Sequence, residues 1–241
     1  ASLSDRIGSG IGRVLGGGGA RGYGPAARLR KRGAALVVML ALPLAAAAQE
    51  TVTVAALGDS LTAGYGLPRD EGFVPTLEDW LAENGHAAEV INAGVSGDTT
   101  AGGLSRLDWT LTDEVDALIV ALGGNDVLRG IDPATSRANL DAILGRADAE
   151  GLPVLLIGMT APGNYGPDYR AAFEAIYPDL AAKHDTLLVE SFFRAFEAGD
   201  LDRARAAYFQ PDGIHPNARG VEVLVADIGP VVADLVARAR D

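Results

Sequence analysis

The residues that could do chemistry are a serine, a histidine and an aspartate in short glycine-containing segments. Ser60 follows an apolar run through Gly58-Asp59 and is expected to open a helix, where a free backbone N–H favours an anion. Asp212 precedes His215 by three positions, which lets the carboxylate accept from Nδ1 and leaves Nε2 facing a serine. Because a serine hydroxyl needs such a base, these residues predict acyl transfer with Ser60 as the nucleophile.

Two further residues could stabilise the oxyanion of such a reaction. Gly97 permits close approach of a backbone N–H, and Asn125 offers a neutral amide donor at the end of a predicted strand. With the Ser60 N–H they would form an oxyanion hole of three donors. The other histidines fit the role of base less well: His86 lies in a turn, and His184 lies at a helix C-terminus, where a cation suits the dipole.

Each of these features alone is more typical of an ordinary structural role. A Gly-Asp-Ser segment is often a helix cap, a single glycine a turn residue, and a single asparagine a cap or Asx-turn residue. The pair Asp212 and His215 alone could be an N-cap beside a loop histidine. Their combination favours function because all four parts occur in chain order, at the strand ends where parallel sheets bind ligands.

Five short apolar runs predict the strands that must position these residues. The runs are Val52–Leu57, Ala88–Ile91, Ala117–Leu122, Val154–Ile157 and Thr186–Val189. They are rich in Val, Ile and Leu without strict alternation, as in strands that are covered on both faces. Helical segments lie between them, so residues 49–241 are expected to form one three-layer α/β/α, doubly wound domain with a five-stranded parallel sheet.

Proline marks two features of the expected helices. Asp132-Pro133 predicts a helix start, because an N-cap residue is followed by proline at the first helical position. Residues 220–240 predict a closing helical segment, and Gly229-Pro230 is expected to kink or break it.

The net charge of −12 combines two segments of opposite sign. Residues 1–48 hold seven basic residues and one acidic residue, which leaves 13 of the 20 basic and 31 of the 32 acidic residues for residues 49–241. So acidic a body repels phosphate backbones and argues against nucleic-acid binding. The chain has no cysteine, which excludes disulfides, thiolate zinc sites, a cysteine nucleophile and a lipid-bearing cysteine.

The N-terminal segment is typical of a secretory signal. A basic stretch, residues 28–32, precedes the apolar run Ala34–Ala48, and small residues at its end predict cleavage before Gln49. An uncleaved anchor or a buried helix is the alternative, although spanning a bilayer takes about 20 residues. Gly17–Gly22 matches the G-x-G-x-x-G pattern, but no strand precedes it, so we interpret it as low-complexity sequence.

Four blocks together resemble the signature of the SGNH (GDSL) hydrolase family. They are Gly58-Asp59-Ser60-Leu61, Ser96-Gly97-Asp98-Thr99, Gly123-Gly124-Asn125-Asp126 and Asp212-Gly213-Ile214-His215-Pro216. Asn164-Tyr165-Gly166 and Ala175-Ile176-Tyr177-Pro178 resemble its small bacterial arylesterase branch, which includes periplasmic thioesterase/lysophospholipase enzymes. The resemblance covers roughly residues 52–237. It implies flavodoxin-like strand order, a triad of Ser60, Asp212 and His215, and an oxyanion hole completed by Gly97 and Asn125.

The resemblance also implies that the loop at residues 159–169 lines the acyl pocket. Its glycines and prolines argue against regular structure there, and a surface loop without a substrate role is the alternative. The candidate substrate-binding residues are Asp59, Pro162, Asn164 and Tyr165. Asp59 is better suited to supporting the turn beside Ser60 than to transferring a proton.

The sequence therefore predicts an exported, cofactor-free serine esterase acting on small acyl esters and thioesters, including aryl esters and lysophospholipids. A carbohydrate or cell-wall O-acetyl esterase using the same site is the alternative, and a binding or scaffold protein with an inactive site is another. Scattered histidines disfavour a metal site, and neither Lys31 nor Lys183 follows a glycine as a phosphate loop requires. Membrane contact is expected only through the signal or a lipid substrate, and nothing requires more than a monomer.

Overall fold

The five predicted apolar runs form the strands of one parallel sheet. The computed structural model describes residues 50–197, 199 and 201–241. The strands are β1 (Val52–Gly58), β2 (Ala88–Gly94), β3 (Ala117–Ala121), β4 (Val154–Ile157) and β5 (Leu187–Val189). They pair in the order β2-β1-β3-β4-β5, and every pair is parallel. This is the doubly wound, flavodoxin-like order, so the predicted fold class is confirmed.

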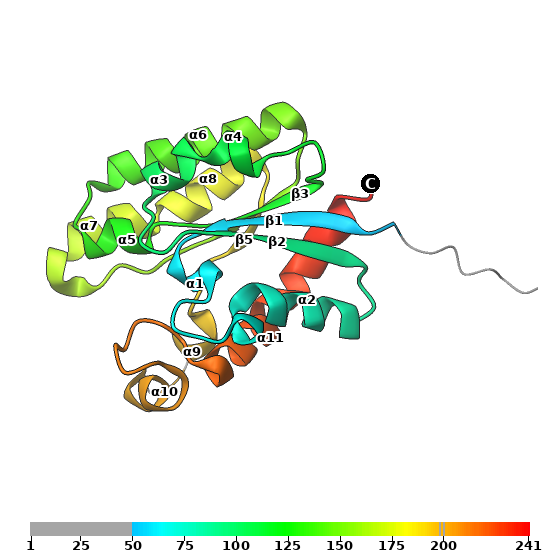
Figure 1. Ribbon diagram of the computed structural model, residues 1–241. Coiled ribbons are helices and arrows are strands. Elements are labelled where there is room, and N and C mark those ends of the chain that lie inside the picture. Colours follow the sequence, from blue (N-terminus) through cyan, green and yellow to red (C-terminus); the bar gives the residue numbers. More distant parts are fainter. Residues whose placement is uncertain (1–49, 198, 200) are drawn as a thin grey trace, which may run out of the picture. The chain divides into compact units, whose positions relative to one another are not determined.

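Helices cover both faces of the sheet (Figure 1). One face carries α2 (Phe73–Glu83) and α11 (Ala218–Arg238). The other carries α3 (Thr100–Ser105), α4 (Leu107–Thr110), α6 (Pro133–Glu150) and α8 (Ile176–His184). Shorter helices are α1 (Ser60–Ala63), α5 (Gly124–Leu128), α7 (Pro167–Glu174), α9 (Arg194–Glu197) and α10 (Leu201–Tyr208), with 3-10 turns at Arg69–Glu71 and Gly163–Tyr165.

The core lies between the sheet and the two helical layers. All five residues of β3 are buried, as expected for a central strand covered on both faces. The face of α6 that meets the sheet is fully buried at Leu140, Ile143, Leu144 and Ala147. Burying a leucine or isoleucine side chain contributes about 1.5–3 kcal/mol, so this face stabilises the packing of α6 on the rest of the domain.

The helix boundaries test the two interpretations of proline. Asp132 caps α6, since its Oδ1 accepts the Ala134 N–H at 2.9 Å with Pro133 at the first helical position, as predicted. Of the kink or break expected at Gly229-Pro230, the break is wrong, because α11 runs through both residues; the kink stays a prediction. Buried residues before and after Pro230 pack on the rest of the domain, and this packing outweighs the hydrogen bond that proline cannot make.

Four predicted strand boundaries are also corrected, and the first is the end of β1, which lies at Gly58 rather than at Leu57. β2 continues past Ile91 to Gly94, because Asn92–Gly94 stay in register with Ala56–Gly58 of β1. β3 ends at Ala121 rather than at the next residue, and β5 starts at Leu187. The longer β2 brings its end level with the end of β1, directly beside the segment that carries Gly97.

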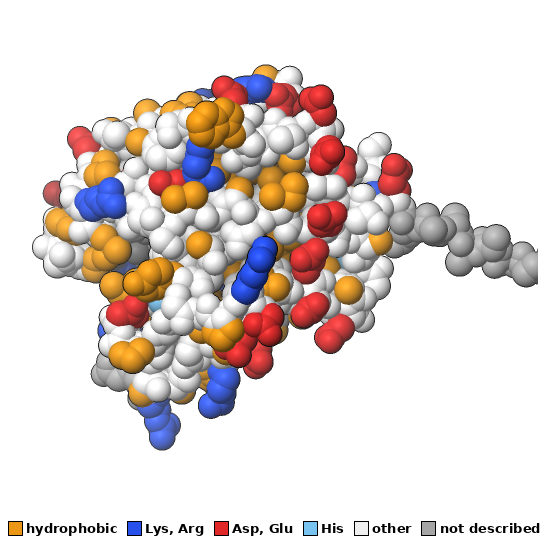
Figure 2. Space-filling view, viewed as in Figure 1, with side chains coloured by type: hydrophobic (Ala, Val, Ile, Leu, Met, Phe, Trp, Pro, Cys, Tyr) orange, Lys and Arg blue, Asp and Glu red, His pale blue; other side chains and the backbone are white. Residues whose placement is uncertain are grey.

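Residues 1–49 lie outside the described residues, and with them the predicted signal, its cleavage point and the Gly17–Gly22 segment. Among the residues that are described, no helix has the length and apolar character needed to cross a membrane. Acidic side chains gather at the right of the face in Figure 2, over the region of β2 and α2.

Candidate active site

Ser60 lies where β1 ends and α1 begins. Asp59 caps this short helix, and its Oδ1 accepts the Leu61 N–H at 3.0 Å. The turn is tight at Gly58, where a Cβ would lie 2.0 Å from Thr62 Oγ1. The sequence pattern of strand, glycine and helix start therefore places the Ser60 hydroxyl at the carboxyl end of the central strands.

The loop before α11 brings His215 against that hydroxyl. His215 Nε2 is 2.8 Å from Ser60 Oγ, and His215 Nδ1 is 2.6 Å from Asp212 Oδ2. The other carboxylate oxygen accepts the backbone N–H groups of Ile214 at 2.9 Å and His215 at 3.0 Å. The hydrogen bond with the imidazole, followed by those from the backbone, lowers the pKa of Asp212 to about 2, so this carboxylate stays ionised.

Gln210 fixes this loop to the segment that follows α1. Its backbone N–H donates to His215 O at 2.7 Å. Its side-chain Nε2 donates to Tyr65 O at 2.7 Å and to Pro216 O at 2.9 Å. The Tyr65 ring lies 4.6 Å from the His215 ring, centre to centre. The imidazole is thereby held on one side by an aromatic ring and on the other by its carboxylate.

Ser60, Gly97 and Asn125, which carry the three candidate oxyanion donors, line the same pocket. Within the described residues, the Ser60 and Gly97 N–H groups donate to no acceptor. Gly97 has φ 86°, a left-handed conformation that suits glycine. Asn125 Nδ2 lies 3.1 Å from Asp59 Oδ2 and 2.9 Å from Asp98 O, so this amide links the Ser60 turn to the Gly97 turn.

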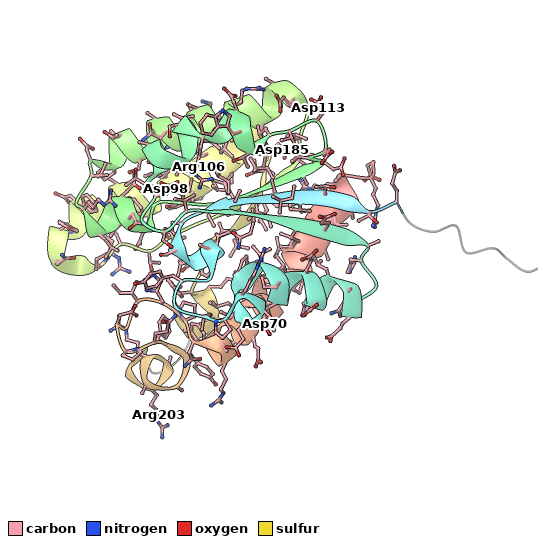
Figure 3. The ribbon with its side chains drawn as sticks, viewed as in Figure 1. Asp70, Asp98, Arg106, Asp113, Asp185 and Arg203 are labelled. Carbon is pink, nitrogen blue, oxygen red and sulfur yellow. The ribbon has the colours of Figure 1, made fainter. Side chains whose placement is uncertain are left out.

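Two arginines hold the turn that contains Gly97. Arg106 Nε is 2.6 Å from Asp98 Oδ2, and its Nη2 donates to Gly58 O at 2.8 Å (Figure 3). Both side chains of this ion pair are less than a fifth exposed, so water screens it only partly. On the other side, Arg129 Nη2 donates to Gly97 O at 2.7 Å. The turn is thus tied both to β1 and to the end of α5.

A buried carboxylate, that of Asp126 in α5, links this helix to α3 and α6. Asp126 is fully buried, and its Oδ2 accepts the Thr100 N–H at 2.8 Å. Its Oδ1 accepts the hydroxyls of Thr100 at 2.5 Å and Ser136 at 2.8 Å. Asn139 Nδ2 donates to Thr100 Oγ1 at 3.0 Å, which completes the network. Asp126 follows Asn125, so the network fixes the helix that presents the candidate amide donor.

These groups open into one pocket of about 340 Å³. Ser60, Gly97, Asn125 and His215 all line it. Its apolar wall includes Leu61, Tyr65, Val127, Leu128, Phe193 and Ile214. Figure 2 shows hydrophobic side chains on both sides of a hollow at the left of the molecule. An apolar pocket with a few convergent polar groups is the usual form of a small-molecule site.

The arrangement has the geometry that nucleophilic acyl transfer requires. A hydroxyl lies within hydrogen-bond reach of an imidazole, and an ionised carboxylate orients the other ring nitrogen. Among the residues that the structure describes, the backbone N–H groups of Ser60 and Gly97 have no acceptor, and both residues line the pocket. Such donors are where a developing oxyanion gains stabilisation.

Residues 56–223 match the GDSL-like Lipase/Acylhydrolase family. The chain belongs to this family. It is 40% identical over 198 residues to Esterase TesA of Pseudomonas aeruginosa, covering 82% of this chain and 96% of that protein. It is 36% identical over 202 residues to Thioesterase 1/protease 1/lysophospholipase L1 of Escherichia coli K12, covering 83% of this chain and 88% of that protein. The solved structure of AlinE4, an SGNH-hydrolase family esterase, aligns with a TM-score of 0.63 at 45% identity, covering 78% of this chain and 98% of that one.

This GDSL acylhydrolase is therefore an ester hydrolase, and the predicted family is confirmed. Its relatives are named esterase, arylesterase, thioesterase and lysophospholipase. Their names agree on hydrolysis of acyl compounds and differ in the leaving group.

Two of the four predicted substrate-binding residues of the GDSL acylhydrolase line the pocket, and the other two do not. Pro162 and Asp59 line the pocket, although Asp59 is only 2% exposed. Asn164 and Tyr165 are not among the lining residues; both are exposed in the 3-10 turn Gly163–Tyr165, so this loop is partly regular. The Tyr165 ring packs 4.9 Å from the Tyr169 ring. A direct contact of Asn164 or Tyr165 with substrate stays a prediction.

The other two histidines of the acylhydrolase have structural surroundings. His86 lies in the turn before β2 and stacks on Trp80 at 6.5 Å between ring centres. His184 bridges α8 to α6, with Nε2 2.7 Å from Asp141 Oδ1 and Nδ1 2.5 Å from Asp148 Oδ2. Burial lowers the pKa of His184, but the two hydrogen bonds outweigh this effect and raise it overall. Neither histidine lines the pocket.

Sequence reasoning missed the residues that hold the GDSL blocks in place. Arg106, Arg129 and Gln210 belong to no block, yet each donates hydrogen bonds to backbone carbonyls of block residues or of their neighbours. Nothing in the sequence signals these long-range contacts. The position of Asp126 beside Asn125, in the same block, could have pointed to its role. Its burial is known only from the structure.

We expect Asp59→Asn to change stability in a pH-dependent way. Burial raises the pKa of Asp59 to about 6, against the hydrogen bonds from Leu61 and Asn125. A carboxyl with a raised folded pKa stabilises the fold fully below its unfolded pKa, and this contribution is lost as pH rises through the folded pKa. The asparagine of the variant does not titrate, so the stability of the variant does not fall in this way as pH rises. Its free energy of unfolding relative to the parent should therefore rise by about 2–3 kcal/mol between pH 4 and pH 7.

Urea unfolding at both pH values measures this change, and Asp113→Asn on an exposed loop is the matched control. The new amide Nδ2 faces the amide of Asn125, which adds a cost that is the same at both pH values. A stability difference that stays constant from pH 4 to pH 7 contradicts the raised pKa.

Proposed function

We propose that this protein hydrolyses carboxylic esters and thioesters through an acyl-enzyme on Ser60. The observation that carries the proposal is the continuous contact from Ser60 Oγ to His215 Nε2 at 2.8 Å and from His215 Nδ1 to Asp212 at 2.6 Å. Ser60 and His215 both line an apolar pocket of about 340 Å³. Esterase function of the relatives agrees with it.

In the first half of the reaction, Ser60 Oγ attacks the carbonyl carbon while its proton passes to His215 Nε2. Asp212 holds the imidazole in the tautomer with Nδ1–H and stabilises the imidazolium that forms. The tetrahedral intermediate then collapses, the bond to the leaving oxygen or sulfur breaks, and His215 returns the proton to that atom. The acyl group stays on Ser60.

The developing oxyanion is stabilised by the N–H groups of Ser60 and Gly97 and by Asn125 Nδ2. The first two have no competing acceptor within the described part of the chain. The amide of Asn125 donates to Asp59 and Asp98 in the free protein, so one of its N–H groups turns to the oxyanion as charge develops. Its link to both turns keeps it close to the required position.

In the second half, a water molecule attacks the acyl carbonyl and gives its proton to His215. The same donors stabilise the second oxyanion, and the proton returns to Ser60 Oγ as the carboxylic acid leaves. The apolar wall at Leu128, Phe193 and Ile214 supports acyl chains longer than acetyl, because each buried methylene adds affinity. Short- to medium-chain esters, including aryl esters and lysophospholipids, are the proposed substrates.

Covalent labelling of the nucleophile tests this function. The protein is assayed on p-nitrophenyl esters from acetyl to palmitoyl and then incubated with a p-nitrophenyl alkylphosphonate. We expect turnover, one equivalent of p-nitrophenol from the phosphonate, and a phosphonyl adduct on the peptide that contains Ser60. Ser96 also lines the pocket and serves as the internal control. An adduct on Ser96, or turnover that survives full labelling, contradicts the proposal.

The same substrate series separates the O-acetyl esterase alternative. An enzyme for acetylated sugars accepts acetyl and little else, whereas the apolar wall supports activity that grows with chain length up to a limit. A profile confined to p-nitrophenyl acetate would replace the proposed substrate class. No turnover and no labelling of the folded protein would favour an inactive binding protein.

The proposal includes export. It rests on the basic and apolar residues within 1–48, which lie outside the described residues, and on the expected cleavage before Gln49. Expression of the whole chain in a bacterium should yield a mature protein whose N-terminus, read by mass spectrometry, is Gln49. An intact N-terminus on the membrane fraction would instead indicate an anchor.

A further inference from the structure

A second pocket adjoins the catalytic one. It has a volume of about 520 Å³, and Phe196 and Glu197 of α9 and Ala204 and Arg205 of α10 form one side of it, so we call it the α9–α10 pocket. The two pockets share part of their walls, namely Leu128, Thr160, Pro162, Phe193 and Ile214. Because the same side chains face both spaces, the second pocket continues the first rather than forming a separate site.

The floor of the α9–α10 pocket is aromatic. The Phe193 and Phe209 rings lie 5.5 Å apart, and the Phe196 and Phe209 rings lie 5.4 Å apart, centre to centre. Phe196 also packs 5.3 Å from Tyr208. Rings in contact with one another form a fixed apolar surface, and Ala204 of α10 leaves space above it.

The charged residues of this pocket do not form an anion site. Arg170 is paired with Glu174 at 2.8 Å, and Glu197 accepts the Ser191 hydroxyl at 2.6 Å. Arg205 is exposed on α10. With Glu174 counted beside its partner, two arginines face two carboxylates, so the rim is close to neutral, and the interior offers apolar contact. This chemistry suits an alkyl chain better than a phosphate or a sugar.

We propose that the α9–α10 pocket binds the distal part of the substrate's acyl chain. The inference rests on the proposed function, because the carbonyl must lie at Ser60 and the chain must leave the catalytic pocket past Phe193 and Ile214. The first carbons occupy the catalytic pocket, and carbons further along the chain reach the aromatic floor. The second pocket thereby sets the preference for medium over short acyl chains.

Filling the second pocket without touching the first tests this assignment. Ala204 lines only the α9–α10 pocket and is half-buried, whereas Ala206 on the same helix is exposed and lines neither pocket. We expect Ala204→Phe to lower kcat/KM for p-nitrophenyl decanoate by about tenfold or more, since each methylene denied burial costs about fourfold. The value for p-nitrophenyl butyrate should stay within about twofold of the parent. Ala206→Phe should change neither value.

The full chain is used throughout, and butyrate hydrolysis reports that each variant is folded. Ala204→Leu, a smaller change, should give an intermediate loss with decanoate. Equal losses on butyrate and decanoate, or no loss on either, overturn the inference while leaving the esterase function intact. If Ala204→Phe lowers kcat/KM for decyl butyrate and not for p-nitrophenyl decanoate, the pocket binds the alcohol part of the ester. That result also overturns the inference. Failure of the parent on every ester contradicts the proposed function itself.

Discussion

Ser60→Ala is expected to lower kcat for ester hydrolysis by about 10⁴–10⁶-fold and to leave the fold unchanged. The hydroxyl contacts His215, and without it no acyl-enzyme can form. Residual turnover would come from the oxyanion donors and from binding, which accelerate attack by water even when the nucleophile is missing. Initial rates with p-nitrophenyl butyrate, at an enzyme concentration high enough to detect slow turnover, measure the loss.

Ser105→Ala is the matched control, because Ser105 is exposed at the end of α3 and bonds only to Gly102 O among the described contacts. It should keep full activity. Urea unfolding of Ser60→Ala should differ from the parent by no more than about 1 kcal/mol, the typical contribution of one hydrogen bond. A loss of activity below about tenfold in Ser60→Ala would remove Ser60 from the role of nucleophile.

Asp126→Ala is expected to lower the free energy of unfolding by about 3–5 kcal/mol. The substitution leaves the Thr100 N–H and two hydroxyls, those of Thr100 and Ser136, buried without their acceptor. Buried donors that have lost both water and their partner are the reason for so large an effect. Equilibrium unfolding in urea measures it.

Graded variants separate this network from a general effect of substitution. Ser136→Ala removes one donor and keeps the carboxylate, so its cost should be about 1 kcal/mol. Asp126→Asn keeps the shape and one acceptor oxygen and should lie between the two. Asp113→Ala on an exposed loop should stay within about 0.5 kcal/mol of the parent. Equal stability of Asp126→Ala and Asp113→Ala would contradict the network's role.

Most of the fold could be predicted from the sequence, because buried strands and the helices that connect them have recognisable sequence patterns. Strands covered on both faces form uninterrupted apolar runs, and parallel order then follows from the helices between them. The helix break expected at Pro230 does not occur, because α11 buries apolar residues on both sides of the proline. Tertiary packing here outweighs the local effect of proline on a helix. The end of β2 was missed because Asn92 is polar, although its backbone continues the ladder.

The candidate site could be predicted as far as it lies in short blocks. Ser60, Gly97, Asn125, Asp212 and His215 stand directly after strands or before a helix, so topology brings them together at one edge. The supporting contacts span 48 residues from Arg106 to Gly58 and 145 from Gln210 to Tyr65. Side chains that reach so far leave no periodic or local pattern. The α9–α10 pocket was missed for the same reason.

The close spacing of Asp212 and His215 has a consequence for how the molecule can change. Asp212 and His215 lie within four residues of one another in the chain. The Asp212 carboxylate contacts the His215 ring through Oδ2, and its Oδ1 accepts the backbone N–H groups of Ile214 and His215. They therefore move as one unit with respect to Ser60. Neither α9 nor α10 takes part in the contact between Asp212 and His215. Substitutions in α9 and α10 could therefore change the α9–α10 pocket while the contact between Asp212 and His215 is kept.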